Sequence, residues 1–123
     1  MTTFESAFWP VEIRVKSADK ALEVTWDDGQ VHHLPAELLR VESPSAEVQG
    51  HGPGQKNLVH GRRHVGIMAV EPIGRYAIRI RFDDLHSSGI FSWDYLRHLG
   101  EQQGRLWQDY VAALAAAGLS RDP

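Results

Sequence analysis

The sequence has 123 residues, no cysteine, and a formal net charge of −3 from 13 Lys and Arg against 16 Asp and Glu. This length suits one domain, and the absence of cysteine excludes disulfides, thiolate-bound metal sites and a cysteine nucleophile. Dispersed basic residues in a mildly acidic chain argue against nucleic-acid binding. Because the sequence shows no leader and no apolar run near the ~18 residues of a membrane span, we expect a cytoplasmic protein without a membrane partner.

The first elements are strands. Apolar and polar residues alternate over 11–16, 22–26 and 31–34, which predicts a β-hairpin followed by a further short strand. Asp28-Gly29 lies between the last two segments and indicates a tight turn, since Gly accepts positive φ. Pro35 then opens a short helix near 35–41, because its fixed φ suits a first helical position.

The segment 42–66 differs from its surroundings. It is rich in Gly, Pro and His and shows no sustained hydrophobic period. Loops of more than about 12–15 residues without regular structure are uncommon in small domains and are usually functional or disordered. We therefore expect functional residues in this loop.

A second hairpin and two helices complete the chain. Strands are predicted over 65–71 and 76–82, with a turn over 72–75 between them and an apolar link over 89–91 after them. Ser92 is the expected N-cap of a helix over 93–97, and a last helix is expected over 105–117. Gly100 and Gly104 bracket the break between these helices.

Together these elements predict an α+β fold, with one or two small antiparallel sheets built from two hairpins. The short helix near 35–41 and the C-terminal helices are expected to pack on one face. The expected core consists of Ile13, Val15, Leu22, Val24, Trp26, Leu38, Ile67, Val70, Ile78, Ile80, Phe82, Trp93 and Leu96.

Several side chains suggest chemistry. The loop over 50–57 contains Lys56 but lacks the Gly-Lys-Ser/Thr of a P-loop, so its glycines more simply permit tight turns, with a backbone anion site as the alternative. Arg62-Arg63 suits phosphate or carboxylate, or pairs with acidic residues of the chain. His51, His64 and His86 are possible metal ligands if the fold brings them together.

A serine nucleophile activated by a histidine is a further hypothesis. Ser43 or Ser88 would have to combine with His86 and Asp84, and none of these serines lies in a G-x-S-x-G elbow. Asp84 follows the strand over 76–82 and is close enough in sequence to orient His86, although turn chemistry explains it more simply.

Five motifs in order resemble the gamma-butyrobetaine hydroxylase-like N-terminal domain family. They lie at 26–29 (WDDG), 34–40 (LPAELLR), 43–50 (SPSAEVQG), 71–77 (EPIGRYA) and 84–93 (DLHSSGIFSW). The resemblance covers about residues 10–100. It leaves an N-terminal arm over 1–9 and a C-terminal helix and tail over 101–123 outside the family domain.

The resemblance implies three contexts for such a domain. It precedes the iron- and 2-oxoglutarate-dependent catalytic domain of certain hydroxylases, it is appended to some P-loop iron–sulfur carriers, and it occurs as a short free-standing bacterial protein of unknown function, the form that this chain resembles. In the hydroxylases the domain binds zinc through three cysteines and a histidine. The corresponding positions here are Ser43, Ser45, Val48 and His86, so that only the histidine is retained and we expect no zinc site and no other cofactor. An H-x-D/E motif for an oxygenase iron is also absent.

These arguments predict a non-catalytic binding or accessory module with a protein partner, and family context suggests a link to iron–sulfur protein assembly. A small anionic ligand is a further possibility. The alternatives are a metal-binding protein using His86 with His51 or His64, and a phosphate- or nucleotide-binding domain using the loop over 50–64. The expected binding surface, which contains no metal, comprises Arg40, Ser43, Ser45, His51, Lys56, Arg62, Arg63, His64 and His86.

Overall fold

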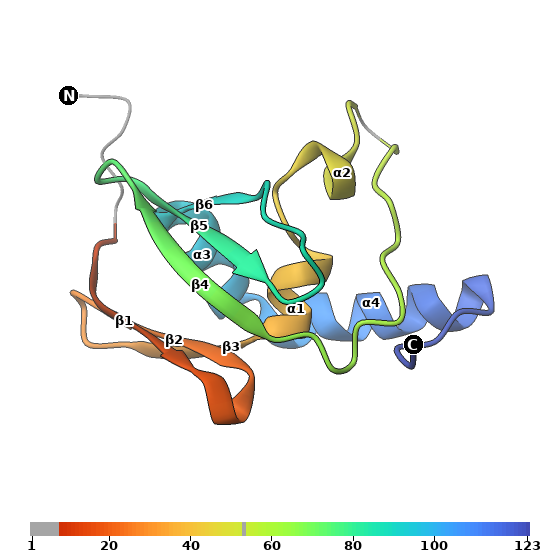
Figure 1. Ribbon diagram of the computed structural model, residues 1–123, viewed down its shortest axis with the longest axis horizontal. Helices are drawn as coiled ribbons and strands as arrows, with labels where there is room; N and C mark the ends of the chain where they lie inside the picture. The colour runs from red at the N-terminus through yellow and green to blue at the C-terminus, as the bar shows by residue number, and fades with distance from the viewer. Residues whose placement is uncertain (1–7, 53) are drawn as a thin grey trace.

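The computed structural model describes residues 8–52 and 54–123 and has the predicted α+β fold (Figure 1). Within the described residues, two three-stranded antiparallel sheets form, sheet A in the order β1-β2-β3 and sheet B in the order β4-β5-β6. Of the expected N-terminal arm, residues 1–7 lie outside the described residues, as does Pro53 of the glycine-rich loop. The elements are β1 (Pro10–Lys16), the 3-10 helix η1 (Ser17–Asp19), β2 (Ala21–Trp26), β3 (Val31–Pro35), α1 (Ala36–Val41), α2 (Ala46–Gln49), β4 (Ile67–Ile73), β5 (Ala77–Phe82), β6 (Ile90–Ser92), α3 (Trp93–Glu101) and α4 (Gln103–Ala117).

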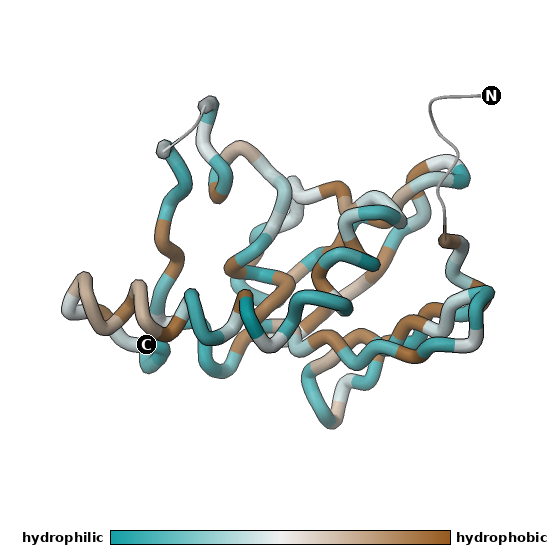
Figure 2. Tube along the Cα trace, turned by 180° about the vertical axis from the view of Figure 1, so that it is seen from behind, coloured by the Kyte–Doolittle hydropathy of each residue, from teal (hydrophilic) through white to brown (hydrophobic). Residues whose placement is uncertain are grey.

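Sheet A forms as the alternation predicts. In β2, Leu22, Val24 and Trp26 are buried, while the residues between them are partly exposed. Hydrophobic and hydrophilic residues accordingly alternate along these strands (Figure 2). Gly29 has a φ of 90°, which confirms the tight turn before β3. Pro35 is the last residue of β3 and precedes α1, so the helix begins one residue later than predicted.

Sheet B contains a strand that the sequence did not indicate. The expected apolar link is instead β6, which pairs with β5 over Ala77–Arg79. The β4–β5 hairpin is present, although β4 begins and ends two residues later than predicted. Ser92 caps α3 as predicted, because its Oγ accepts a hydrogen bond from the Tyr95 backbone N–H at 3.1 Å. Helix α3 contacts both β3 and β6 and so joins the two sheets.

The core lies between the sheets and helices α1 and α3. Nine of the thirteen predicted core residues are buried, whereas Ile13, Ile67 and Val70 are only partly buried and Val15 is 39% exposed. These four lie on β1 or β4, which are edge strands with a sheet neighbour on one side only. The buried cluster consists of Leu22, Val24, Trp26, Leu34, Ala36, Leu38, Leu39, Val65, Ile78, Ile80, Phe82, Phe91, Trp93, Leu96 and Leu99.

Gly100 lies inside α3, and the break between α3 and α4 falls at Gln102 rather than between Gly100 and Gly104. A Cβ at Gly100 would overlap the His32 ring, which accepts a hydrogen bond from Trp26 Nε1 at 2.9 Å. We expect Gly100→Ala to lower the free energy of unfolding by about 1–3 kcal/mol through overpacking.

Gly104 is a matched control for this prediction. It lies in α4, and no atom of the described part of the chain is near its added Cβ. Gly104→Ala should therefore raise the free energy of unfolding by about 0.5–1 kcal/mol through helix propensity. Urea unfolding of both variants measures the difference. Equal effects of the two substitutions would contradict the packing of Gly100 against His32.

The residues after α4 turn back along the loop over 61–63. Backbone N–H groups of Gly61 and Arg63 donate to the carbonyls of Ser120 and Arg121, at 2.9 and 3.0 Å. The Arg121 guanidinium donates to both carboxylate oxygens of Glu37, at 2.8 and 2.9 Å. The tail therefore fixes the end of the loop against α1.

Candidate functional site

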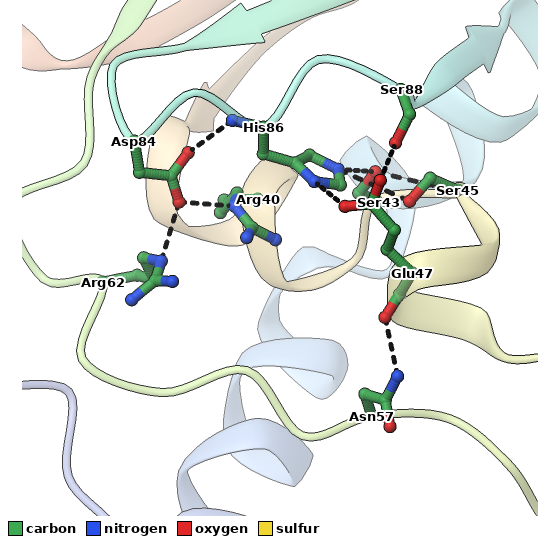
Figure 3. Close-up of polar contacts among 9 residues, drawn as sticks. All are labelled: Arg40, Ser43, Ser45, Glu47, Asn57, Arg62, Asp84, His86 and Ser88. Carbon is green, nitrogen blue, oxygen red and sulfur yellow. Dashed lines mark hydrogen bonds and ion pairs between the residues drawn. The ribbon is translucent and has the colours of Figure 1, made fainter.

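Three side chains at positions singled out in the sequence meet where the start of the loop over 42–64 contacts the turn between β5 and β6. Ser43 follows α1, Ser45 precedes α2, and His86 lies in the turn between β5 and β6. The Oγ atoms of Ser43 and Ser45 are 2.9 and 3.5 Å from His86 Nε2 (Figure 3). All three residues are buried, and Ser43 is 0% exposed.

The contact of the other ring nitrogen of His86, Nδ1, shows which nitrogen of the imidazole carries the proton. Nδ1 is 3.1 Å from a carboxylate oxygen of Glu47, whose second oxygen accepts a hydrogen bond from Ser88 Oγ. Because a carboxylate only accepts, Nδ1 carries the proton, and Nε2 accepts the hydroxyl proton of Ser43. Burial, and after it the charge of Arg40, lowers the pKa of His86, while Glu47 opposes them. His86 is therefore a neutral imidazole near pH 7.

Asp84 forms the second centre of polar contacts. Its Oδ2 accepts hydrogen bonds from Nε of Arg40 and Nε of Arg62, both at 2.7 Å, and its Oδ1 accepts from the His86 backbone N–H at 3.1 Å (Figure 3). Burial alone would raise the pKa of Asp84, but the hydrogen bonds from Arg40 and His86 outweigh it and lower that pKa. One carboxylate thus joins α1, the loop and the turn before β6.

The loop itself is ordered by further polar contacts. Lys56 Nζ lies 2.7 Å from the buried carboxylate of Glu42, Gln49 Nε2 donates to the Ser43 carbonyl at 3.0 Å, and Asn57 Nδ2 donates to the Glu47 carbonyl at 2.7 Å. The loop also contains α2, so the expectation of a segment without regular structure is wrong over 46–49.

The structure divides the expected surface into two groups. Arg40, Ser43, Ser45, Arg62 and His86 come together around the two centres just described. They are largely buried, apart from Arg62, so most of this group supports the surface from within rather than forming its outer layer. The sequence analysis did not single out Glu47, although it lies within the motif over 43–50, and it gave Asp84 only as a possible partner of His86.

The remaining four residues lie apart from these centres. His51, Lys56, Arg63 and His64 are exposed. Lys56 and Arg63 are each paired with a carboxylate. The His64 carbonyl accepts a hydrogen bond at 2.9 Å from Nζ of Lys20, the residue between η1 and β2.

The glycine-rich loop forms turns, as its composition indicates. Gly50 and Gly54 both have a φ of 76°, and a Cβ at Gly50 would overlap the backbone of Gln55. Lys56, the cation of this loop, is already paired with Glu42.

No three His, Asp or Glu side chains among the described residues form a group that could hold a metal ion. Around His86 Nε2 the available donors are two serine hydroxyls, and the fourth position given by the resemblance carries the isopropyl group of Val48. Zn²⁺ in structural sites takes thiolate and imidazole ligands, so the residues present do not fit it.

A nucleophilic triad of Ser43 or Ser88 with His86 and Asp84 does not form. Asp84 contacts the backbone of His86 and not its ring, and Ser88 Oγ donates to Glu47. Ser43, His86 and Glu47 do follow one another in the order of a serine–histidine–acid series. Ser43 is nevertheless fully buried, and a substrate carbonyl cannot approach its Oγ.

Stability should fall on acidification because of His86. Its lowered pKa means that the unfolded chain takes up a proton below about pH 6.5 that the folded chain does not, so stability is lost as the pH falls from there through the folded pKa. The slope from one histidine is at most about 1.4 kcal/mol per pH unit. Burial lowers the pKa of His32 as well, so it contributes with the same sign.

Urea unfolding at pH 7.5 and 5.5 measures this effect. We expect the free energy of unfolding of His86→Gln to change less between these two pH values than that of the wild type. His51→Gln is the matched control, because it makes the same substitution at an exposed histidine outside the contacts of His86. Equal slopes for the wild type and His86→Gln would contradict a neutral, buried His86.

The chain is similar to one protein family and to several solved structures. The family model for gamma-butyrobetaine hydroxylase-like, N-terminal matches residues 13–97. Two NMR solution structures are similar, one at 50% identity covering 94% of this chain and 90% of the other with a TM-score of 0.82, and one at 42% identity covering 100% and 92% with a TM-score of 0.83. A search of curated proteins gave no match.

A crystal structure of a protein of unknown function from Acidithiobacillus ferrooxidans, of the DUF971 family, is 41% identical over 74% of this chain and 91% of the other, with a TM-score of 0.63. In the described part of this chain, no helix has the length and apolar character to cross a membrane. The match over residues 13–97, which spans both sheets, the His86 turn and most of α3, shows that the chain belongs to the gamma-butyrobetaine hydroxylase-like N-terminal family.

Proposed function

We propose that this protein is a non-catalytic binding module, whose binding surface is the loop over 42–64 together with the turn over 83–88. The observation that carries the proposal is the attachment of this loop to the fold. Asp84 and His86, both in the turn, hold α1, α2 and the loop through buried or partly buried hydrogen bonds. An exposed loop held on a rigid scaffold is a common form of binding surface.

The partner that suits this surface is another protein. The outer side chains include His51, Lys56, Arg63, His64 and the 68%-exposed Glu47, which carry both signs of charge. Lys56 and Arg63 already have carboxylate partners, which favours a mixed polar interface over a cradle for one phosphate. Because similar domains are appended to P-loop iron–sulfur carriers in the family context, such carriers are the first class of partner to test.

Affinity capture tests the binding surface with matched variants of the full chain. His51→Ser, Arg63→Ser and His64→Ser together remove exposed side chains without touching the buried contacts of His86 and Asp84. We expect at least one protein retained by the wild type to fall about tenfold in retention.

The control variant places the same kind of change elsewhere. Glu12→Ser with Arg14→Ser alters exposed residues of β1, on the other sheet, and should leave retention unchanged. Equal retention by the wild type and the loop variant contradicts the proposal, as does the absence of any protein retained specifically by the wild type.

The reactivity of Ser43 toward a covalent probe tests the proposal that the protein is not catalytic. A fluorophosphonate probe labels activated serines, and Ser43 is the serine that donates to His86. We expect no labelling of the folded protein, because Ser43 is 0% exposed. Labelling that Ser43→Ala abolishes would show a reactive nucleophile and overturn the non-catalytic assignment.

A further inference from the structure

Leu85 is in a conformation that its side chain disfavours. It has a φ of 74°, and its side chain is not used in the core, since the residue is 83% exposed. Its backbone N–H closes a turn onto the Phe82 carbonyl at 3.1 Å. An L side chain at positive φ is strained, and glycine would form the same turn without that strain. Packing within the fold therefore gives no reason for a leucine here.

A second exposed apolar side chain lines the same hollow as Leu85. Met68 is 66% exposed, at the irregularity of β4 between Ile67 and Ala69. A cavity of about 260 Å³ lies in this region, and its lining includes Met68, Ala69, Arg81 and Leu85, which we call the Leu85 patch. The hollow is large enough for one apolar side chain, and Met68 and Leu85 are the exposed apolar residues of its lining.

The sheet surface beside the Leu85 patch carries two arginines, the exposed Arg81 and the partly buried Arg79. The cross-strand pairs place Arg79 opposite Glu71 and Arg81 opposite Ala69, so both arginines share one face with a single glutamate. Glu71 is 3.4 Å from Arg81. Nε of Arg79 is buried and has no hydrogen-bond partner among the residues that the structure describes. Asp83 follows Arg81 by two residues, and its carboxylate lies close to Gly66.

We propose that the Leu85 patch docks a segment of a partner protein that carries an apolar side chain flanked by carboxylates. The apolar side chain would occupy the hollow between Leu85 and Met68, and the carboxylates would meet Arg81 and Arg79. This inference rests on the proposed function, because it names the chemistry of the partner and extends its docking face from the turn over 83–88 onto sheet B.

Leu85→Gly separates docking from folding. It removes the exposed side chain and relieves the positive φ, so we expect an unchanged or higher melting temperature together with weaker binding. Arg81→Gln removes one cation of the surface, which is 58% exposed and, within residues 8–52 and 54–123, pairs with Glu71 alone, at 3.4 Å. Val11→Thr is the control, since Val11 is a 62%-exposed apolar residue on sheet A.

The experiment selects binders of the full chain from a displayed library of random 12-residue peptides. We expect enrichment of peptides with Leu, Ile or Phe next to Asp or Glu. The dissociation constant of the most enriched peptide, made synthetically, should rise at least tenfold with Leu85→Gly and severalfold with Arg81→Gln, and not with Val11→Thr.

Several outcomes overturn the inference. These are peptides without acidic residues, equal binding by wild type and Leu85→Gly, and failure to enrich any peptide. Leu85-dependent self-association in sedimentation, or Leu85-dependent binding to anionic phospholipid vesicles in place of peptide, assigns the patch to a second copy or to a membrane and also overturns it. Peptides lost with the variant at positions 51, 63 and 64, but not with Leu85→Gly, retain the proposed function and reject only this docking face.

Discussion

Asp84→Asn is expected to lower the free energy of unfolding by about 3 kcal/mol, within the range for removing one partner of a buried ion pair. Asp84 accepts hydrogen bonds from Arg40, Arg62 and the His86 backbone, and the Arg40 side chain is only 10% exposed. Asparagine keeps the shape but not the charge. The Arg40 guanidinium would then be a buried cation without a counter-ion, which is the main source of the expected loss.

The neighbouring Asp83 supplies the control for this prediction. It is exposed, and Asp83→Asn should change the free energy of unfolding by no more than about 0.5 kcal/mol. Urea unfolding measures both variants, and amide hydrogen exchange shows where protection is lost. We expect faster exchange in the loop over 42–64 for Asp84→Asn, and equal stability of the two variants would contradict the role of Asp84 in holding the loop.

Arg62→Gln should cost much less than Asp84→Asn. Both arginines contact the same carboxylate oxygen at 2.7 Å, but the Arg62 side chain is 35% exposed and solvent screens its charge. Contributions of such pairs are about 0–1 kcal/mol. Burial of the partner, and not the hydrogen-bond distance, therefore decides which contact of Asp84 stabilises the fold.

Local sequence patterns predicted those helices, strands and turns that have a pattern or motif within their own residues. Hydrophobic alternation predicted β2, and Asp28-Gly29 predicted the turn that leads to β3. The N-cap residue Ser92 predicted the start of α3. The strand β6 and helix α2 have three and four residues, which is too short for a period of either kind to appear. Strand β6 exists because β5 offers it backbone partners, and such pairing between separate segments has no local sequence signature.

The candidate site was predicted in its residue types and only partly in its arrangement. Ser43, Ser45 and His86 were singled out together by a resemblance in motif order, and they do meet. Composition and spacing alone left His51 and His64 as equal candidates, because segments 20 or more residues apart are brought together only by the fold. The burial of individual side chains could not be predicted either, since nothing in the local sequence distinguishes the buried Arg40 from the exposed Arg63.

Replacing Ser43, Ser45 and Val48 together with cysteine is expected to create a zinc site with His86. The Oγ atoms of both serines already lie within 3.5 Å of His86 Nε2, and Val48 follows Ser45 by one turn with its N–H on the Ser45 carbonyl. Three thiolates and one imidazole suit tetrahedral Zn²⁺, and apparent binding free energies of structural zinc are on the order of 10 kcal/mol near pH 7. We expect one equivalent of zinc in the variant by elemental analysis, none in the wild type, and a melting temperature that a chelator lowers in the variant alone.

The same triple variant with His86→Gln supplies the control, because it keeps the thiolates and removes the imidazole. Zinc should bind it more weakly, and the chelator-sensitive part of its melting temperature should shrink. A folded triple variant that takes up no zinc would show that these four positions do not form a metal-ligand arrangement, and one equivalent of zinc in the wild type would contradict the argument from its donor set. If both expectations hold, the hydrogen bond from Ser43 to His86 and the contact of Ser45 with the same nitrogen join the loop and the turn at the positions where a bound metal ion could join them.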